Sequence, residues 1–206
     1  MKWMILVAAV LAFGLCAEES DSKKEVVVND AAFHAALLNI AKEYASYGRV
    51  DDEARWAPYL CRTPNPSVAR ISASKDSETH GSKLYFLFVK QRDAYLKHGD
   101  QSGQVIVKEG WTPKEVPADT KTAVQPGEHY VPFAKKDGKV FHADSKSALF
   151  IMLKLDPKTA GTDEGWVYGT VTPDGKNVTS AGRVSSCMGC HQEAKTDRLF
   201  GLAPAK

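Results

Sequence analysis

One short motif near the C-terminus constrains this chain more than any other feature: Cys187-Met188-Gly189-Cys190-His191. Two cysteines three positions apart, followed at once by a histidine, form the attachment signature of a c-type haem. The thiols form thioethers with the vinyl groups of the porphyrin, and the histidine offers a ring nitrogen to the iron. We therefore expect one covalently bound haem c, with Cys187 and Cys190 as thioether residues and His191 as the proximal iron ligand.

Two other uses of a Cys-x-x-Cys pair are a thioredoxin-like redox centre and one half of a zinc site. A zinc shell would need a second pair of cysteines or histidines at ligand spacing, and the sequence has none. Once haem has used two thiols, Cys61 has no partner for a disulfide in the mature chain, so we expect an inert thiol there.

The first residues predict export. Lys2 precedes an apolar run that ends at Leu15, and Cys16-Ala17 is followed by acidic residues, which is the pattern of a signal peptide over residues 1–17 with cleavage near Ala17. A lipid anchor at Cys16 is the alternative. The apolar run is short for a membrane span, and no later stretch is long enough to be one. Because c-type haem is attached outside the cytoplasm, we expect a periplasmic or secreted protein.

The composition excludes some partners and sets the domain size. With 27 basic and 25 acidic side chains the net charge is close to zero, so nucleic acid is not an expected partner. After cleavage, about 185 residues suffice for one sizeable core. We divide the chain into an N-terminal extension of helix and Pro/Ser-rich loop (18–82) and a haem domain (83–206).

Hydrophobic patterns predict an α+β fold: a β-rich antiparallel sheet with an N-terminal helix and a C-terminal haem-bearing helix. Apolar residues at three- and four-residue steps predict a helix from Asn29 to about Tyr47, and the segment 61–82 reads as a loop. A short helix is expected near 92–97, and the terminal helix from 185 could run through Phe200. The predicted strands are 83–89, 104–109, 130–134, 139–143, 147–155 and 166–172.

The place of the motif predicts a five-coordinate iron. Only fifteen residues follow His191 and none is Met or His, so a second axial ligand would have to come from upstream. An iron with an open distal side favours chemistry or ligand binding over plain electron transfer. The upstream candidates, each more often an ordinary core or surface residue, are His80, His129, His142 and Met152.

Several segments together resemble the cytochrome P-460 family, a close relative of cytochrome c′-beta. They are the strand Gly103–Glu109, the strand centred on Trp166, the haem motif, and the tail Ala194-Lys195-Thr196-Asp197 with Phe200. The resemblance is best from about 83 to 202. The four-helix-bundle c′ cytochromes also carry a late haem motif, but the strand-rich centre argues against that fold.

The resemblance implies a homodimeric, largely antiparallel-β haem protein. In the enzymatic members a strand lysine is bonded to the porphyrin edge and the enzyme oxidises hydroxylamine; Lys108 occupies the matching position. Alternation along the strand puts Ile106 and Lys108 on one face, and Val105, Val107 and Glu109 on the other. Without the family resemblance, we would interpret Lys108 as an ordinary solvated lysine on a strand.

One departure weakens the enzymatic reading. Active relatives use a carboxylate shortly before the haem motif as a proton relay, whereas residues 176–186 contain no Asp or Glu. Glu109, Glu128 or Asp144 would have to supply that base. Otherwise the protein would bind small ligands in a dry pocket, for which the candidate lining residues are Phe86, Phe88 and Phe133.

Three functions follow as hypotheses. The first is oxidation of hydroxylamine or a similar small nitrogen compound, with electrons passed to a redox partner cytochrome. The second is binding of diatomic gases, nitric oxide or carbon monoxide, without catalysis, and the third is simple electron transfer. Candidate partners for the haem propionates are Arg62, Arg70 and Arg183.

Overall fold

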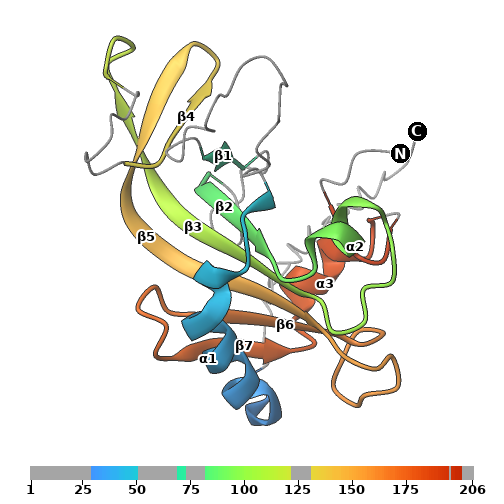
Figure 1. The fold of residues 1–206 in the computed structure, drawn as a ribbon. Coiled ribbons are helices and arrows are strands. Elements are labelled where there is room, and N and C mark those ends of the chain that lie inside the picture. Colours follow the sequence, from blue (N-terminus) through green and yellow to red (C-terminus); the bar gives the residue numbers. More distant parts are fainter. Residues whose placement is uncertain (1–28, 51–68, 73–81, 122–130, 195, 201–206) are drawn as a thin grey trace, which may run out of the picture.

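The computed structural model describes residues 29–50, 69–72, 82–121, 131–194 and 196–200, and Figure 1 shows their arrangement. Within these residues, seven strands form one antiparallel sheet in the order β1-β2-β3-β5-β6-β7, with β4 paired to β5. This confirms the predicted α+β class. The strands are β1 (Arg70–Ile71), β2 (Leu84–Val89), β3 (Val105–Val116), β4 (Phe133–Lys136), β5 (Lys139–Lys154), β6 (Trp166–Val171) and β7 (Val178–Gly182).

Helices lie on both sides of the sheet (Figure 1). On one side, η1 (Ala31–Phe33), α1 (His34–Glu43) and η2 (Tyr44–Ser46) form the predicted N-terminal helix as three consecutive pieces. On the other side lie α2 (Arg92–Leu96) and the haem-motif helix α3 (Ser185–His191). None of the described helices is long and apolar enough to cross a membrane.

Two hydrophobic clusters occupy the two faces of the sheet because side chains alternate along each strand. Val105 and Val107 of β3 pack under the N-terminal helix with Leu37, which is fully buried. Ile106, one residue along, joins the cluster on the opposite face, which includes Tyr95 of α2. The sheet therefore forms the middle layer of three, and α3 sits on the side of Ile106.

The N-terminal helix is fixed to the sheet at both ends. At its start, the Asp30 N–H donates to the carbonyl of Ala181 on β7 at 3.1 Å, and the Asp30 side chain caps the first turn by accepting from the N–H of Ala32 at 3.0 Å. At its end, the hydroxyl of Tyr44 donates to the carboxylate of Glu109 on β3. Lys146 of β5 completes this cluster with an ion pair to Glu109 at 2.9 Å. Burial and the neighbouring Glu109 raise the pKa of Tyr44 to about 12, so the hydroxyl keeps its proton and remains a donor.

The strands of the structure differ from the predicted strands in three places. β1 lies inside the stretch expected to be loop, as a two-residue strand. β5 is one continuous strand over both predicted segments, because its polar middle faces solvent and pairs with the bulged part of β3 around Trp111. β7 was not predicted, since its sequence Val-Thr-Ser-Ala-Gly has little apolar character and pairs at the sheet edge.

The terminal helix is shorter than expected. α3 ends at His191, and Asp197 and Arg198 then adopt positive φ values of 39° and 64°. Leu199 N–H donates to the carbonyl of Thr196 at 2.8 Å, which closes a tight turn. The chain therefore folds back toward the haem motif instead of continuing as a helix to Phe200.

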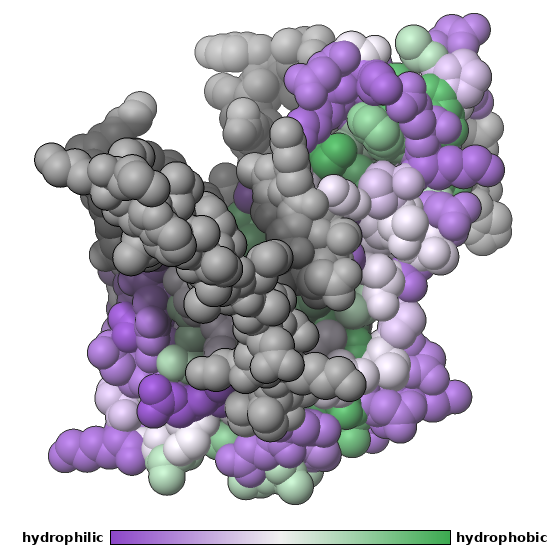
Figure 2. Space-filling model, turned by 180° about the vertical axis from the view of Figure 1, so that it is seen from behind, coloured by the Kyte–Doolittle hydropathy of each residue, from purple (hydrophilic) through white to green (hydrophobic). Residues whose placement is uncertain are grey.

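The described surface is mostly hydrophilic in the view from behind, with small separate hydrophobic patches (Figure 2). Among the described residues, the large hydrophobic side chains that are exposed are Leu96, Val131 and Phe200. Phe200 is half exposed and lies where the returning tail meets α2, because the Tyr95 hydroxyl donates to its carbonyl at 3.0 Å.

Candidate functional site

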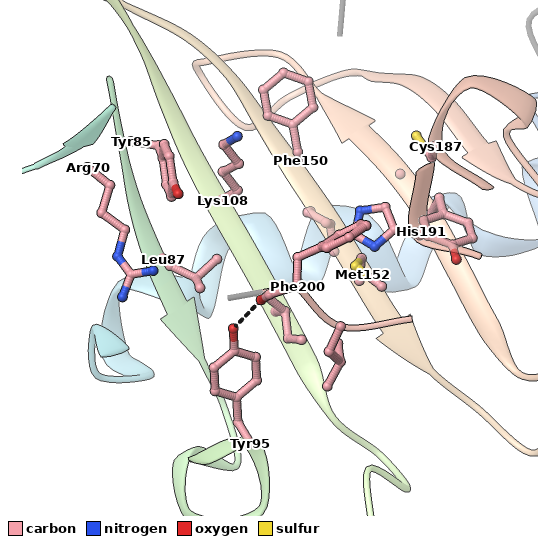
Figure 3. Close-up of a pocket in the computed structure, with 15 residues that line it drawn as sticks. Arg70, Tyr85, Leu87, Tyr95, Lys108, Phe150, Met152, Cys187, His191 and Phe200 are labelled. Carbon is pink, nitrogen blue, oxygen red and sulfur yellow. Dashed lines mark hydrogen bonds between the residues drawn. The ribbon is translucent and has the colours of Figure 1, made fainter. Parts of the chain in front are cut away.

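A pocket lies between α3 and the sheet (Figure 3). One wall comes from the face of β2, β3, β5 and β6 that carries Ile106, and the other from α3 with the tail that follows it. The pocket and its open mouth contain about 880 Å³ of space free of atoms. Its lining includes Lys108, Phe150, Met152, Cys187, His191 and Phe200.

Helix α3 presents the haem motif to this pocket. Cys187 and His191 are four residues apart, so they lie on the same helix face, and both line the pocket. Cys190, one turn from Cys187, is exposed. The two cysteines are not joined by a disulfide, as thioether formation requires.

The His191 ring is held in one tautomer. Its Nδ1 lies 2.6 Å from the backbone carbonyl of Arg198. A carbonyl only accepts hydrogen bonds, so Nδ1 carries the proton and Nε2 keeps a lone pair for a metal. Burial lowers the pKa of His191, which favours the neutral, ligating form. The Tyr168 and Phe200 rings flank the imidazole at centroid distances of 5.5 and 5.4 Å.

The tail after the motif is anchored by Asp197, which belongs to the Ala194-Lys195-Thr196-Asp197 segment of the family resemblance. Asp197 accepts hydrogen bonds from Lys154 Nζ at 2.8 Å and Trp166 Nε1 at 3.0 Å. The strand of Trp166 and the Thr-Asp tail therefore form one junction, which places Arg198 beside His191. Asp163 and Arg198, which complete the junction, were missed, and no local motif marks them.

Lys108 lies on the pocket side of β3 (Figure 3). Its Nζ donates to Ser72 Oγ at 3.3 Å and sits 4.1 Å from the ring centroid of Tyr85. Burial, with a smaller contribution from the charge of Lys83, lowers the pKa of Lys108 to about 8. The amine therefore loses its proton far more readily than a surface lysine, as a nucleophile or a base must.

Glu109 is not brought to the pocket. It faces the N-terminal helix, where it accepts hydrogen bonds from Tyr44, Trp111 and Lys146. Asp144 is exposed on β5, and Glu128 lies outside the described residues. No carboxylate is found among the described residues that line the pocket.

The expected aromatic lining was wrong. Phe86 is buried on the opposite face of β2, because Tyr85 and Leu87 are the β2 residues that line the pocket. Phe88 and Phe133 are also absent from the lining, and Phe150 of β5 takes the aromatic position instead.

Of the candidate sixth ligands, Met152 lines the pocket and His142 does not. His142 packs near Phe133 on the far part of β5. His80 and His129 lie outside the described residues, as do Cys61, Arg62 and the expected signal peptide. Arg70 lines the pocket, whereas Arg183 is exposed at its position before α3.

The donor set fits a c-type haem. Two thiols that are not joined by a disulfide stand one helical turn apart, and a neutral imidazole that carries its proton on Nδ1 lines a pocket whose other wall is largely apolar. Comparison with known families gives a match to Cytochrome P460 over residues 68–200. The comparison with curated proteins gave no match. The matched region holds the whole pocket, and the chain therefore belongs to the cytochrome P460 family of haem proteins.

Proposed function

We propose that this protein is an exported mono-haem c-type protein with a five-coordinate iron and that it oxidises hydroxylamine or a similar small nitrogen compound. Lys108 would be bonded to the porphyrin edge, as the family resemblance implies. The observation that carries the proposal is the position of Lys108, whose amine lines the same pocket as Cys187 and His191.

The residues of the chain would divide the work as follows. Cys187 and Cys190 would hold the porphyrin, and His191 would ligate the iron, which when bound would supply the redox chemistry. Lys108, with a pKa of about 8, has roughly a tenth of its amines neutral at pH 7, against fewer than one in a thousand for an ordinary lysine. A neutral amine is the form that forms a bond to carbon.

The second candidate is a gas-binding protein without catalysis. Oxidation of hydroxylamine releases protons, and a base within hydrogen-bond reach should receive them. Among the described residues, the pocket offers no carboxylate for this and presents Leu87, Ile106 and Phe150 instead. Such a lining suits nitric oxide or carbon monoxide. Simple electron transfer is the third possibility and would need a sixth ligand, for which Met152 is the pocket residue to test.

The experiment is peptide mass mapping and a ferrous absorption spectrum of the purified haem protein, with hydroxylamine turnover measured alongside. We expect a haem peptide that contains Lys108, and we expect K108M to lose both the cross-link and the turnover. K114M is the matched control, since Lys114 is exposed on the same strand. A wild-type digest that frees Lys108 from haem, with an ordinary five-coordinate spectrum that shifts on adding nitric oxide, would favour the gas-binding function.

The proposal has three further parts, of which the first two are independent of the reaction. We propose export to the periplasm with cleavage near Ala17, a homodimer, and a soluble cytochrome as electron acceptor. The mass of the mature N-terminus, sedimentation of the haem protein, and reduction of added cytochrome during turnover test them in turn.

A further inference from the structure

A buried carboxylate lies behind the proximal histidine. Asp163 is 5% exposed. Its Oδ2 accepts from Arg198 Nε and from the Tyr168 hydroxyl, both at 3.1 Å. Its Oδ1 accepts from a terminal nitrogen of Arg198 and from Gln192 Nε2, both at 3.3 Å. The charge is thus fully hydrogen-bonded and paired in a fork with one arginine.

Each of these three donors belongs to the surroundings of His191. Arg198 provides the carbonyl that holds Nδ1, Tyr168 packs its ring against the imidazole, and Gln192 is the next residue in the chain. Arg198 also has a φ of 64°, a conformation that non-glycine residues adopt only at an energetic cost. Its ion pair with Asp163 offsets that cost and keeps the carbonyl aimed at the ring.

We propose that Asp163 is a positioning residue for the haem iron, acting on His191 through Arg198. By fixing the Arg198 carbonyl, it keeps the Nδ1–H hydrogen bond short and the imidazole electron-rich. A more basic axial imidazole binds the iron more strongly and favours its ferric state. This inference rests on haem ligation by His191, which is part of the proposed function, and is independent of hydroxylamine oxidation.

The test compares the D163N and E164Q variants of the haem protein. Glu164 is the matched control because it also contacts Arg198, at 3.1 Å, but its side chain is 70% exposed and contacts one terminal guanidinium nitrogen, whereas Asp163 is buried and accepts from that nitrogen and from Nε. We measure the reduction potential and the iron–histidine stretching band of the ferrous protein by resonance Raman. In D163N we expect the band to move to lower frequency. We also expect the equilibrium constant for reduction to rise about tenfold, or about 59 mV for a one-electron couple; E164Q should leave both unchanged.

R198Q serves as a second variant in case D163N does not fold. It removes the ion pair from the other side, leaves Tyr168 and Gln192 on Asp163, and should shift both readouts in the same direction as D163N. Wild-type readouts in every folded variant would overturn the proposal. A wild-type protein without bound haem, or with a low-spin six-coordinate iron, would instead overturn the proposed function, so the two failures are distinguishable.

Discussion

At the residue scale, Lys108 has an unusual environment because β3 is a central strand. β2 and β5 pair with it on either side, so the Lys108 side chain is only partly exposed to water. The amine retains one hydrogen bond, to Ser72, and the Tyr85 ring. These contacts compensate only part of the hydration that a charged ammonium loses, so burial favours the neutral amine.

This predicts a stability that depends on pH. Because burial lowers the pKa of Lys108 from 10.5 to about 8, below pH 8 the amine is charged in both the folded and the unfolded chain, and the folded state carries the full cost. Between about pH 8 and 10.5 the unfolded state binds more protons, so the free energy of unfolding rises with pH. The cost is on the order of 3 kcal/mol at most.

The measurement uses the C187A/C190A chain, where no haem can interfere. K108M should raise the free energy of unfolding at pH 7, and the gain should fade as the pH approaches 10.5. K114M should show no such dependence. An equal gain from K108M at pH 7 and pH 10 would contradict the prediction.

The residues of the site differ in how far the sequence could predict them. Cys187, Cys190 and His191 form a contiguous motif whose spacing defines its chemistry, and strand alternation put Lys108 and Glu109 on opposite faces. Asp163 could not be predicted, because it meets Arg198 across 35 positions. Nothing local marks such a pair, and only the tertiary fold brings its two members together.

At the element scale, the N-terminal helix docks where β6 has no side chain. A Cβ added to Gly169 would lie 2.6 and 2.7 Å from the two terminal carbons of Leu37. Leu37 is fully buried, so it has no free space into which to move. The glycine therefore sets the close approach of α1 to the sheet.

We expect G169A to lower the free energy of unfolding by about 1–3 kcal/mol through overpacking. Urea denaturation of G169A, L37V and the double variant measures this. Shortening Leu37 should relieve part of the strain, so the double variant should lose less than the sum of the single losses. Strict additivity would show that the two residues do not compete for the same space.

The elements themselves were predictable to the extent that their apolar patterns were strong. The N-terminal helix, β2, β3 and β6 have such patterns. β7 does not, because it owes its pairing to β6 and not to its own composition. The end of α3 could not be predicted either. The tail after the helix is held by contacts of Asp197 with Lys154 and Trp166, which lie on other strands.

At the scale of the whole molecule, the family match covers fewer residues than the folded unit does. The match begins at residue 68, after the N-terminal helix. Yet Phe33, Leu37 and Ile40 belong to the same buried cluster as strand residues of β3 and β5. Each buried apolar side chain of this size contributes about 1.5–3 kcal/mol, so the helix is part of the core on which the haem pocket is built.

A chain that starts at residue 68 should therefore not fold as an independent domain. Without the helix, Val107, Leu149 and Ile151, each at most 2% exposed in the full structure, would face water on one side of the sheet. We expect the 68–206 fragment to bind a hydrophobic dye and to lose its cooperative thermal transition. A chain that starts at residue 29 should keep a single transition. If the fragment unfolded cooperatively with the free energy of the longer chain, the helix would be an accessory to the pocket's fold and not a part of it.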